Sequence, residues 1–462
     1  MSAYTKPDAE LVNKYAGTGP RYTSYPTAPQ FREDFDIASY RAAMNPDSTE
    51  PLSLYLHIPF CQDICYYCAC NKIVTREPGT ANRYLSALRE EMQMQADLHG
   101  RKRPISQMHW GGGSPTYLEN AEVTQLMHDL AVNFKLLGDG DREYSIELDP
   151  RTTNDDAIPL FKGLGFNRVS LGIQDFDPQV QASINRVQPL EMVQKLVDEV
   201  RLYDFRSLSF DLIYGLPHQS AATMETTLKQ VVSLRPDRIA CFNYAHLPER
   251  FKSQRAIDRL TLPSATEKLA LQAQISGMLQ AEGYHHIGLD HYVLPGDDLA
   301  RAQTEGTLQR NFQGYSLQLA DDILGMGVSS ISQVGDYYVQ NARELDHYYR
   351  DIQAGKLPVH RGYHTSAEDR LRRQVIMALI CNLQLDTRQL PVPEDATFRS
   401  HFSEEHTALE DMARDGLLEL DAGEIRVTEL GRPFLRNICM VFDQYLVPRS
   451  DAADTPRYSA VV

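Results

Sequence analysis

The sequence predicts an α/β protein: a partial (βα)6 barrel of the TIM type, followed by a smaller, mainly helical, winged-helix-like C-terminal domain. Between residues 53 and 291, short apolar runs alternate with longer amphipathic segments, which is typical of βα units that feed a parallel sheet. Polar residues of several kinds stand where the apolar runs end, as functional residues do in barrels. Six good strands are fewer than the eight of a closed barrel, so we expect a splayed barrel with a lateral opening.

The expected strands and helices follow one another in regular order. Strands are predicted at 53–58, 106–110, 144–148, 168–173, 207–213 and 238–244, with a weaker seventh at 286–290. Helices whose apolar residues recur at three and four positions are predicted between them, for example at 81–98, 121–134, 190–202 and 221–233.

The C-terminal part is expected to be a separate domain. Glycine, proline and a loss of periodicity mark a boundary at 355–366. We therefore divide the chain into an N-terminal arm (1–50), a barrel with extensions (51–360) and a mainly helical domain (361–462). Helices at 369–383 and 404–415, then the hairpin LLELDAGEIRVTELG, suggest the winged-helix resemblance. The acidic second helix offers no face for DNA, so we expect a packing lid over the barrel.

Composition favours a soluble cytoplasmic protein. The net charge of −16 argues against nucleic acid as a general partner. No apolar run approaches the ~20 residues of a membrane helix, and the first residues contain no apolar signal core. Seven cysteines, four of them within 61–70, suit metal binding in a reducing compartment. Cys241, Cys381 and Cys439 lie in apolar surroundings and are expected to be buried and inert.

A cysteine motif, Cys61-x3-Cys65-x2-Cys68, follows the first strand. Three thiolates from one loop can hold three irons of a four-iron cluster and leave the fourth iron open. S-adenosylmethionine (SAM) could chelate that iron through its amino group and carboxylate, and the cluster's electron would then cleave its sulfonium. The alternative is a structural zinc site, but such sites favour paired cysteines or Cys/His sets that make four ligands.

Candidate ligand-binding residues stand at the other strand ends. The run Gly111-Gly112-Gly113 lets backbone groups approach a ligand closely, although a simple turn is an alternative. Glu147 and Asp211 are carboxylates on otherwise apolar strands, so they would bind ribose hydroxyls or an amine, or else pair with a helix N-terminus or an arginine. Cys70 would be a non-ligand beside the substrate, because filling the fourth iron would block the chemistry.

Seven long stretches resemble one enzyme family. They are GPRYTSYPTA (19–28), SLYLHIPFCQDICYYCACNKIVTR (53–76), HWGGGSPTYL (109–118), SIELDPR (145–151), GIQDF (172–176), NFQGY (311–315) and LGMGVSSIS (324–332). They resemble the radical SAM superfamily and, within it, the oxygen-independent coproporphyrinogen III dehydrogenase family. The resemblance covers nearly the whole chain, and it implies a 4Fe-4S cluster and two SAM molecules per chain.

The resemblance also implies the site residues. Cys61, Cys65 and Cys68 would bind the cluster, and Tyr55, Cys70 and Glu147 would be catalytic. SAM would contact Tyr55, Tyr67, Gly112, Gly113, Ser114, Glu147, Gln174, Arg186, Asp211, Ala245 and Ile331, with Gln174, Arg186 and Asp211 serving mainly the second molecule. Ser114 and Tyr67 stand where the family usually has threonine and phenylalanine, and Ala69-Cys70 stands in place of Gly-Cys.

The implied reaction is the oxidative decarboxylation of two propionates of coproporphyrinogen III to vinyl groups, giving protoporphyrinogen IX in anaerobic haem biosynthesis. Substrate contacts are expected at Arg21, Phe312 and Gln313. On composition alone, the arm that carries Arg21 could instead be a disordered tail. The expected partner is an unidentified reductant, such as a flavodoxin-type donor, and a monomer is expected. The alternative is a haem chaperone of the same superfamily, whose members usually carry an aromatic residue at position 70.

Overall fold

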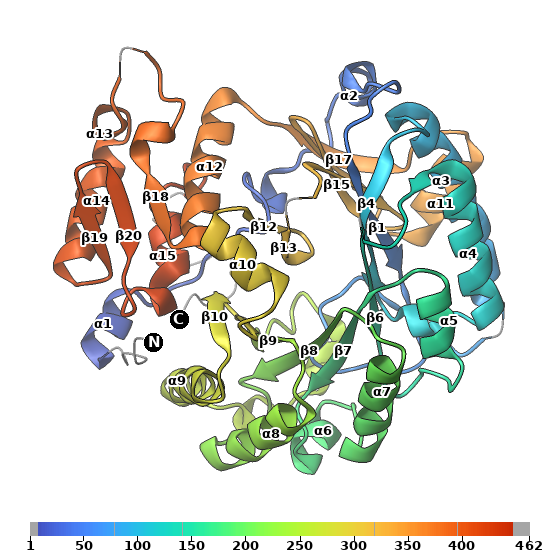
Figure 1. The fold of residues 1–462 in the computed structure, drawn as a ribbon, viewed down its shortest axis with the longest axis horizontal. Coiled ribbons are helices and arrows are strands. Elements are labelled where there is room, and N and C mark those ends of the chain that lie inside the picture. Colours follow the sequence, from blue (N-terminus) through green and yellow to red (C-terminus); the bar gives the residue numbers. More distant parts are fainter. Residues whose placement is uncertain (1–7, 78, 141, 318, 395, 447–462) are drawn as a thin grey trace. The chain divides into compact units, whose positions relative to one another are not determined.

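The structure is a computed structural model that describes residues 8–77, 79–140, 142–317, 319–394 and 396–446. Six parallel strands confirm the six strands expected for the barrel (Figure 1). In sheet order they are β1 (Leu52–Ile58), β4 (Pro104–Gly112), β6 (Glu143–Leu148), β7 (Arg168–Gln174), β8 (Ser207–Tyr214) and β9 (Arg238–Asn243). Since strands consecutive in this order pair in parallel, their C-terminal ends lie along one rim of the sheet.

Helices connect these strands and lie along the outer side of the sheet (Figure 1). They are α3 (Thr80–His99), α4 (Asn120–Asn133), α5 (Ala157–Gly163), α6 (Pro178–Ser183), α7 (Leu190–Leu202) and α8 (Ala221–Leu234). The α7 helix shows why the sequence predicts them: Val193, Leu196, Val197 and Val200 form one buried stripe at helical spacing. The predicted helices at 81–98, 121–134, 190–202 and 221–233 are confirmed within one or two residues.

The sheet continues beyond β1, which the sequence did not predict. Strand β14 (Asp322–Met326) pairs in parallel with β1, and it is followed by the antiparallel strands β15 (Ile331–Val334), β16 (Tyr337–Asn341) and β17 (Val359–His364). Helix α11 (Leu345–Gln353) connects β16 to β17. The expected irregular stretch at 355–366 therefore contains a strand. Its polar composition hides it, because β17 ends the sheet path and only Gly362 in it is buried.

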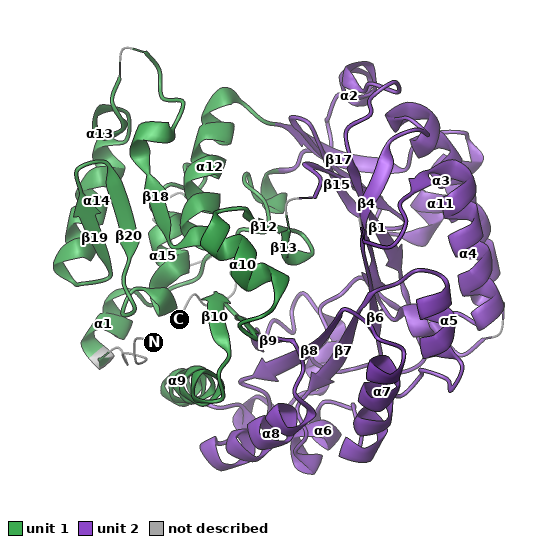
Figure 2. Cartoon of the chain, in the orientation of Figure 1, with its two compact units in different colours: residues 1–30, 264–318, 365–462 green, residues 31–263, 319–364 purple. Residues whose placement is uncertain are grey.

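The chain forms two compact units (Figure 2). Unit 2 comprises residues 31–263 and 319–364, and it holds the strands described above together with α2 (Ile37–Ala43), β2 (Phe60–Cys61), β3 (Ile73–Val74), β5 (Lys135–Leu136) and the 3-10 helix η3 (Lys252–Ala256). Unit 1 comprises residues 1–30, 264–318 and 365–462.

Unit 1 is mainly helical. Its elements are α1 (Ala9–Lys14), α9 (Ala265–Ala281), β10 (His285–Gly288), β11 (His291–Val293), α10 (Asp298–Glu305), β12 (Leu308–Asn311), β13 (Gly314–Leu317), α12 (Ala367–Asn382), β18 (Gln384–Asp386), α13 (Phe398–His401), α14 (Ser403–Arg414), β19 (Leu418–Asp421), β20 (Glu424–Val427) and α15 (Leu435–Met440). Helices α12 and α14 and the β19–β20 hairpin confirm the elements predicted for the C-terminal part, and β18 makes a third strand beside β20.

The N-terminal arm folds as part of unit 1. Tyr22 and Tyr25 are buried in its hydrophobic core. The Tyr22 hydroxyl donates to Asp443 Oδ2 at 3.0 Å, and the Tyr25 hydroxyl accepts from the Gln444 N–H at 3.2 Å. These contacts exclude the disordered-tail interpretation for residues 19–28.

Two further predictions from composition concern the three cysteines outside the loop and membrane-spanning helices. Cys241, Cys381 and Cys439 are buried, as predicted. Among the described residues, no helix combines the length and the apolar character needed to cross a membrane.

A buried carboxylate on α3 fixes the loop between β14 and β15. Glu91 Oε2 accepts from the Gly327 N–H at 2.8 Å and from the Tyr348 hydroxyl at 2.7 Å, while Oε1 accepts from Asn341 Nδ2 at 2.6 Å. Burial raises the pKa of Glu91, and these hydrogen bonds partly offset that rise. Ile331 is the first residue of β15, directly after this loop, so the network also holds in place the segment that carries this predicted SAM contact.

Replacing Glu91 by alanine should strip three buried donors of their acceptor. We expect Glu91→Ala to lower the free energy of unfolding by about 3 kcal/mol or more. The neighbouring Glu90 is exposed, so Glu90→Ala should change it by less than about 0.5 kcal/mol. Urea unfolding followed by circular dichroism measures both, and equal shifts for the two variants would contradict the role of the network.

Candidate active site

The cysteine motif lies on a loop that the backbone closes at its base. Strands β2 and β3 pair in parallel, with Cys61 opposite Val74. The Ile73 N–H donates to the Pro59 carbonyl at 2.7 Å, and the Thr75 N–H donates to the Cys61 carbonyl at 3.0 Å. The two ends of the loop are therefore held together directly after β1.

Polar side chains bind the backbone carbonyls of this loop. Lys72 Nζ and Ser253 Oγ both donate to the Cys68 carbonyl, at 2.9 and 3.0 Å. Asn185 Nδ2 donates to the Ile64 carbonyl at 2.7 Å. Since these bonds engage the backbone, the cysteine side chains stay available to the cavity that the loop borders.

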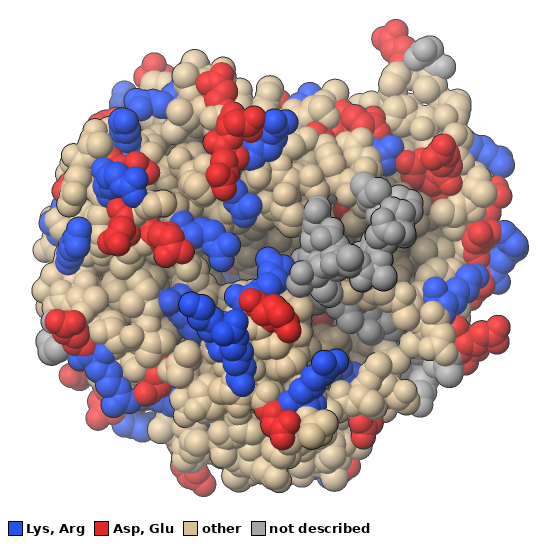
Figure 3. All heavy atoms as spheres, turned by 180° about the vertical axis from the view of Figure 1, so that it is seen from behind, with Lys and Arg blue, Asp and Glu red and all other residues tan. Residues whose placement is uncertain are grey.

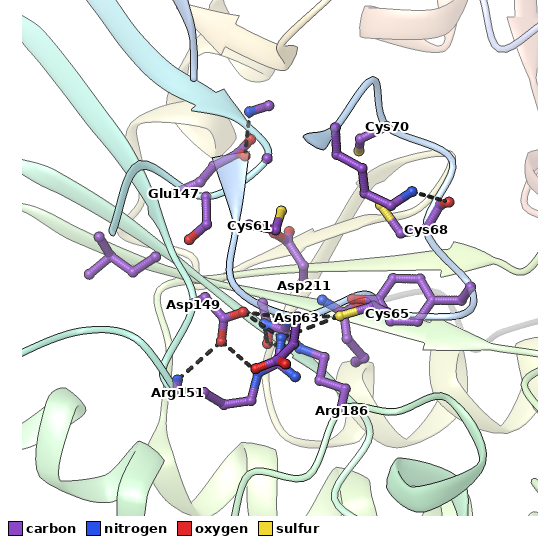
Figure 4. Close-up of a pocket in the computed structure, with 18 of the residues that line it drawn as sticks. Cys61, Asp63, Cys65, Cys68, Cys70, Glu147, Asp149, Arg151, Arg186 and Asp211 are labelled. Carbon is purple, nitrogen blue, oxygen red and sulfur yellow. Dashed lines mark hydrogen bonds and ion pairs between the residues drawn. The ribbon is translucent and has the colours of Figure 1, made fainter. Parts of the chain in front are cut away.

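This cavity has a volume of about 280 Å³ and collects most of the predicted site residues (Figure 4). All of them come from unit 2. The predicted residues that line it are Cys61, Cys65, Tyr67, Cys68, Cys70, Gly112, Gly113, Ser114, Glu147, Gln174, Arg186 and Asp211. Asp63, Lys72, Leu148, Asp149, Arg151, Gly172, Ile213 and Phe242 complete the lining.

The thiols that face this cavity differ in their electrostatics. A hydrogen bond from the Cys70 thiol, helped by Lys72, lowers the pKa of Cys68 to about 6 against the opposing effect of burial. Burial raises the pKa of Cys61 to about 12. Cys70 thus lies beside Cys68 as a donor, and its role beside the substrate stays a prediction.

The donor set fits a four-iron cluster. Four thiols from one loop line the cavity, and the three of the motif could each bind one iron of such a cluster. A zinc ion would instead need its sulfurs gathered at about 2.3 Å from one point. In the described part of the chain, no three His, Cys, Asp or Glu side chains are placed to hold a single ion in that way.

The glycine run packs tightly against the protein itself. A Cβ on Gly111 would lie 2.8 Å from the Glu147 carboxylate, and one on Gly112 would lie 2.5 Å from His57 Nδ1. Gly112 also has a φ of 113°, a conformation that favours glycine. The sequence predicts that these glycines let the backbone approach a ligand closely. The structure shows that they are also required for the packing around Glu147 and His57.

Glu147 is held in the ionised form. His109 Nε2 lies 3.0 Å from Glu147 Oε1, and the Gly112 N–H donates to Oε2 at 3.4 Å. Burial opposes ionisation, yet the hydrogen bond and the electrostatic interaction with His109 outweigh it, so the pKa of Glu147 lies below its ordinary value. Its side chain remains 43% exposed, so its oxygens are open to a ligand.

Asp211 has the opposite electrostatics. Burial and then the charge of Glu147 raise the pKa of Asp211 to about 7, although Ser170 Oγ donates to its Oδ2 at 3.1 Å. Of these two cavity carboxylates, Glu147 is therefore charged and Asp211 is neutral below about pH 7. Two carboxylates separated in this way can bind different ligand groups.

Tyr55 lies on β1 just outside the cavity lining. Its hydroxyl is 3.0 Å from His57 Nδ1, and its ring stacks on His109 with centroids 5.9 Å apart. Tyr55 is also paired in register with Gly325 of β14, where a Cβ would lie 2.5 Å from the Ile331 carbonyl oxygen. Gly325 thus links the strand that carries Tyr55 to the strand that begins at Ile331, although these two predicted contacts lie far apart in the sequence.

Ala245 is likewise outside the lining but is tied to the cysteine loop. Gln254 Nε2 donates to the Tyr67 carbonyl at 2.9 Å and to the Ala245 carbonyl at 3.1 Å. One buried amide thus brings together two predicted SAM contacts that lie far apart in the chain.

Sequence reasoning missed an acid–arginine cluster next to Cys65 (Figure 4). Asp149 Oδ2 accepts from Arg151 Nη2 at 2.6 Å and from Arg186 Nη1 at 3.0 Å. Burial opposes ionisation of Asp149, but Arg186 and Arg151 lower its pKa to about 2. The stretch SIELDPR contained the signal, since it places an acid and an arginine directly after the third barrel strand.

The three expected substrate contacts belong to unit 1 and do not line this cavity. Phe312 and Gln313 form the turn between β12 and β13, where the Gln313 N–H donates to Asn311 Oδ1 at 2.8 Å. The Arg21 carbonyl accepts from Arg310 Nε at 3.3 Å. Their contact with substrate stays a prediction.

The sequence matches two known families. Residues 55–231 match the radical SAM superfamily, and residues 365–434 match the HemN C-terminal domain. The chain is 45% identical to the oxygen-independent coproporphyrinogen III oxidase of Pseudomonas aeruginosa, over 98% of both chains. It is 46% identical to the Escherichia coli protein of the same name, over 95% of both chains.

The fold has a counterpart among solved structures. The Escherichia coli coproporphyrinogen III oxidase, described there as a radical SAM enzyme, superposes with a TM-score of 0.90 at 45% identity. The match covers 96% of this chain and all of the other.

The raised pKa of Asp211 predicts a pH-dependent stability. The folded protein keeps a proton on Asp211 up to about pH 7, while an unfolded aspartate loses it near pH 4, so stability should fall as pH rises through this window. Asp211→Asn removes this pH-dependent contribution to the free energy of unfolding. Without SAM, its stability relative to the unmodified protein should therefore increase by roughly 1 kcal/mol between pH 5 and pH 8, because cavity water screens part of the effect.

Urea unfolding at the two pH values measures this difference. Asp198→Asn, at an exposed position of α7, controls for the loss of a surface carboxylate. A difference for Asp211→Asn that does not change with pH would contradict the assigned shift.

Proposed function

The chain belongs to the oxygen-independent coproporphyrinogen III oxidase family, and on that premise we propose that it converts coproporphyrinogen III to protoporphyrinogen IX as a radical SAM enzyme. One observation carries the proposal: Cys61, Cys65 and Cys68 face a single cavity in which Cys70 and Glu147 also lie. The family's enzymes are oxidoreductases of haem biosynthesis. The haem-chaperone alternative loses its support, because the relatives are named oxidases and position 70 is cysteine.

Cys61, Cys65 and Cys68 would hold the cluster, which would supply the electron for SAM cleavage and hence the radical chemistry that removes a hydrogen atom from the β-carbon of a propionate. Loss of carbon dioxide and of one electron to an external acceptor then leaves a vinyl group. A second round acts on the second propionate. The protein's own residues bind, orient and shield the reactants, and no general base is required.

Glu147 and the glycine run are the proposed contacts of the SAM molecule on the cluster. The ionised Glu147 accepts hydrogen bonds from an amine or ribose hydroxyls. Gly112 and Gly113 leave backbone groups open beside it, and Ser114 adds a hydroxyl at the cavity wall. Tyr55, Tyr67, Ala245 and Ile331 complete the proposed contact set from neighbouring strands.

A second SAM molecule is proposed on Gln174, Arg186 and Asp211, which line the same cavity. Gln174 and Arg186 both crowd Gly172, where a Cβ would lie 2.8 Å from each side chain. Asp211 lies opposite Gly172 in the β7–β8 register. Two cofactors for two decarboxylations would match the two propionates.

The partners and the setting are also proposed. An unidentified external reductant, such as a flavodoxin-type donor, would reduce the cluster, and the enzyme works as a cytoplasmic monomer. Arg21, Phe312 and Gln313 contact the porphyrinogen. Nucleic acid is not expected as a partner, because the net charge is −16 and the face drawn in Figure 3 carries acidic and basic side chains side by side.

An anaerobic assay tests the function. The reduced, reconstituted protein with SAM should convert coproporphyrinogen III to protoporphyrinogen IX, measured by chromatography of the oxidised porphyrins. Formation of no product by a protein with full iron and sulfide content would refute the proposed reaction.

The four loop cysteines should separate into two classes. Cys65→Ala should lose both the cluster and the activity, since it removes an iron ligand. Cys70→Ser should keep the 4Fe-4S absorbance while product formation falls about tenfold to hundredfold, the cost of a misplaced group in an active site. Iron and sulfide analysis together with the assay decides, and cluster loss in Cys70→Ser equal to that in Cys65→Ala would show that Cys70 is a ligand.

Arg186 tests the second SAM molecule. Loss of a charged hydrogen bond costs about 1.5 to 3 kcal/mol, which is about tenfold to hundredfold in affinity. Arg186→Ala should therefore bind close to one SAM per chain where the unmodified protein binds two. Anaerobic equilibrium binding of labelled SAM measures this, with the exposed Arg206→Ala as control. A stoichiometry of one in the unmodified protein would refute the second site.

A further inference from the structure

Cys65 differs from the other two motif cysteines in its surroundings. It is buried, whereas Cys61 and Cys68 are only partly so. Arg151 Nη2 donates to Cys65 Sγ at 3.3 Å, and Arg186 Nη1 reaches the same sulfur at 3.5 Å. Among the described hydrogen bonds of the three cysteines, arginine donors to sulfur are found at Cys65 alone (Figure 4).

The Arg151 guanidinium is fixed on several sides. Arg151 Nε and Nη2 donate to the two carboxylate oxygens of Asp149, at 3.0 and 2.6 Å, and Nη1 donates to the Asn185 carbonyl at 3.2 Å. The Arg151 backbone N–H also donates to Asp149 Oδ1 at 3.1 Å. A planar fork held in this way has little freedom left, so the second N–H of Nη2 is directed at the Cys65 sulfur.

The same geometry joins the sulfur to the rim of the barrel. Asp149 follows β6 directly, and its carboxylate also accepts from Arg186. Asn185, which accepts from Arg151 through its carbonyl, donates through its side chain to the Ile64 carbonyl next to Cys65. Arg151 therefore bridges the end of a barrel strand, the cysteine loop and the sulfur itself.

We propose that Arg151 is a positioning residue that holds the Cys65 sulfur and makes the bound cluster easier to reduce. Reduction adds a negative charge that is shared with the cysteine sulfurs. A donated N–H bond and a nearby positive charge stabilise the reduced form more than the oxidised form, and hydrogen bonds to the sulfurs are known to set such potentials. Arg186 also donates to this sulfur, but it is already proposed to bind the second SAM molecule. Arg151 has no such proposed ligand.

This inference depends on the proposed function, because it requires the cluster. The test is a dye-mediated potentiometric titration of the reconstituted proteins without SAM, with the reduced cluster followed by electron paramagnetic resonance. Arg151→Met removes the donor and the charge, while Arg151→Lys keeps the charge but cannot hold Asp149 and Cys65 in one planar fork. Arg76→Met is the matched control, because Arg76 is exposed and its Nη2 bonds Asp63 at 2.5 Å.

Arg151→Met should keep its iron and sulfide and become at least tenfold harder to reduce, which is a shift of about 59 mV to more negative potential for one electron. Arg151→Lys should shift in the same direction by less. Arg76→Met should leave the midpoint unchanged.

Three outcomes would count against the inference. An unchanged midpoint in a cluster-loaded Arg151→Met protein would overturn it, and so would an equal shift in Arg76→Met, which would indicate a general charge effect. If Arg151→Met does not retain the cluster, Arg151→Lys decides alone, and an unchanged midpoint there would also overturn it. Failure of the unmodified protein to hold any cluster would instead refute the proposed function.

Discussion

The parallel pairing of β1 with β4 on one side and β14 on the other is the constraint on which the site depends. All residues of β1 except Tyr55 are buried, as is usual for a central parallel strand. Its register places Tyr55 beside His109 and Gly325, and Ile58 beside Gly112. Because the cysteine loop begins where β1 ends, this register sets the loop against the glycine run. A shift of one residue would turn these side chains to the opposite face.

Charge inside the cavity is arranged by neighbours rather than by exposure to water. Glu147 is ionised because His109 and the Gly112 N–H bind it, and that charge helps to keep Asp211 protonated. Asp149 balances two arginines that would otherwise be buried without an anion. The cavity can thus present a carboxylate, a neutral acid and guanidinium groups at separate points around one cluster-binding loop.

Long-range hydrogen bonds hold this arrangement in place. Gln254 ties the cysteine loop to the end of β9, and Asn185 ties it to the segment after α6. Glu91 performs the same task for the loop before Ile331. Each of these side chains satisfies backbone donors or acceptors, and Gln254 and Glu91 do so in a buried setting, where an unmet hydrogen bond costs about 1 to 3 kcal/mol.

The sequence by itself determined the six barrel strands, their helices and the cysteine motif, because these depend on local periodicity and spacing. It also singled out Glu147 and Asp211, because an acid in an apolar strand is conspicuous. Only the tertiary structure decided that β14 extends the barrel and that β17 is a strand, since both depend on pairing partners far along the chain. It alone showed that Asp149 and Arg151 reach Cys65, because that contact joins residues 86 positions apart and no local pattern encodes it.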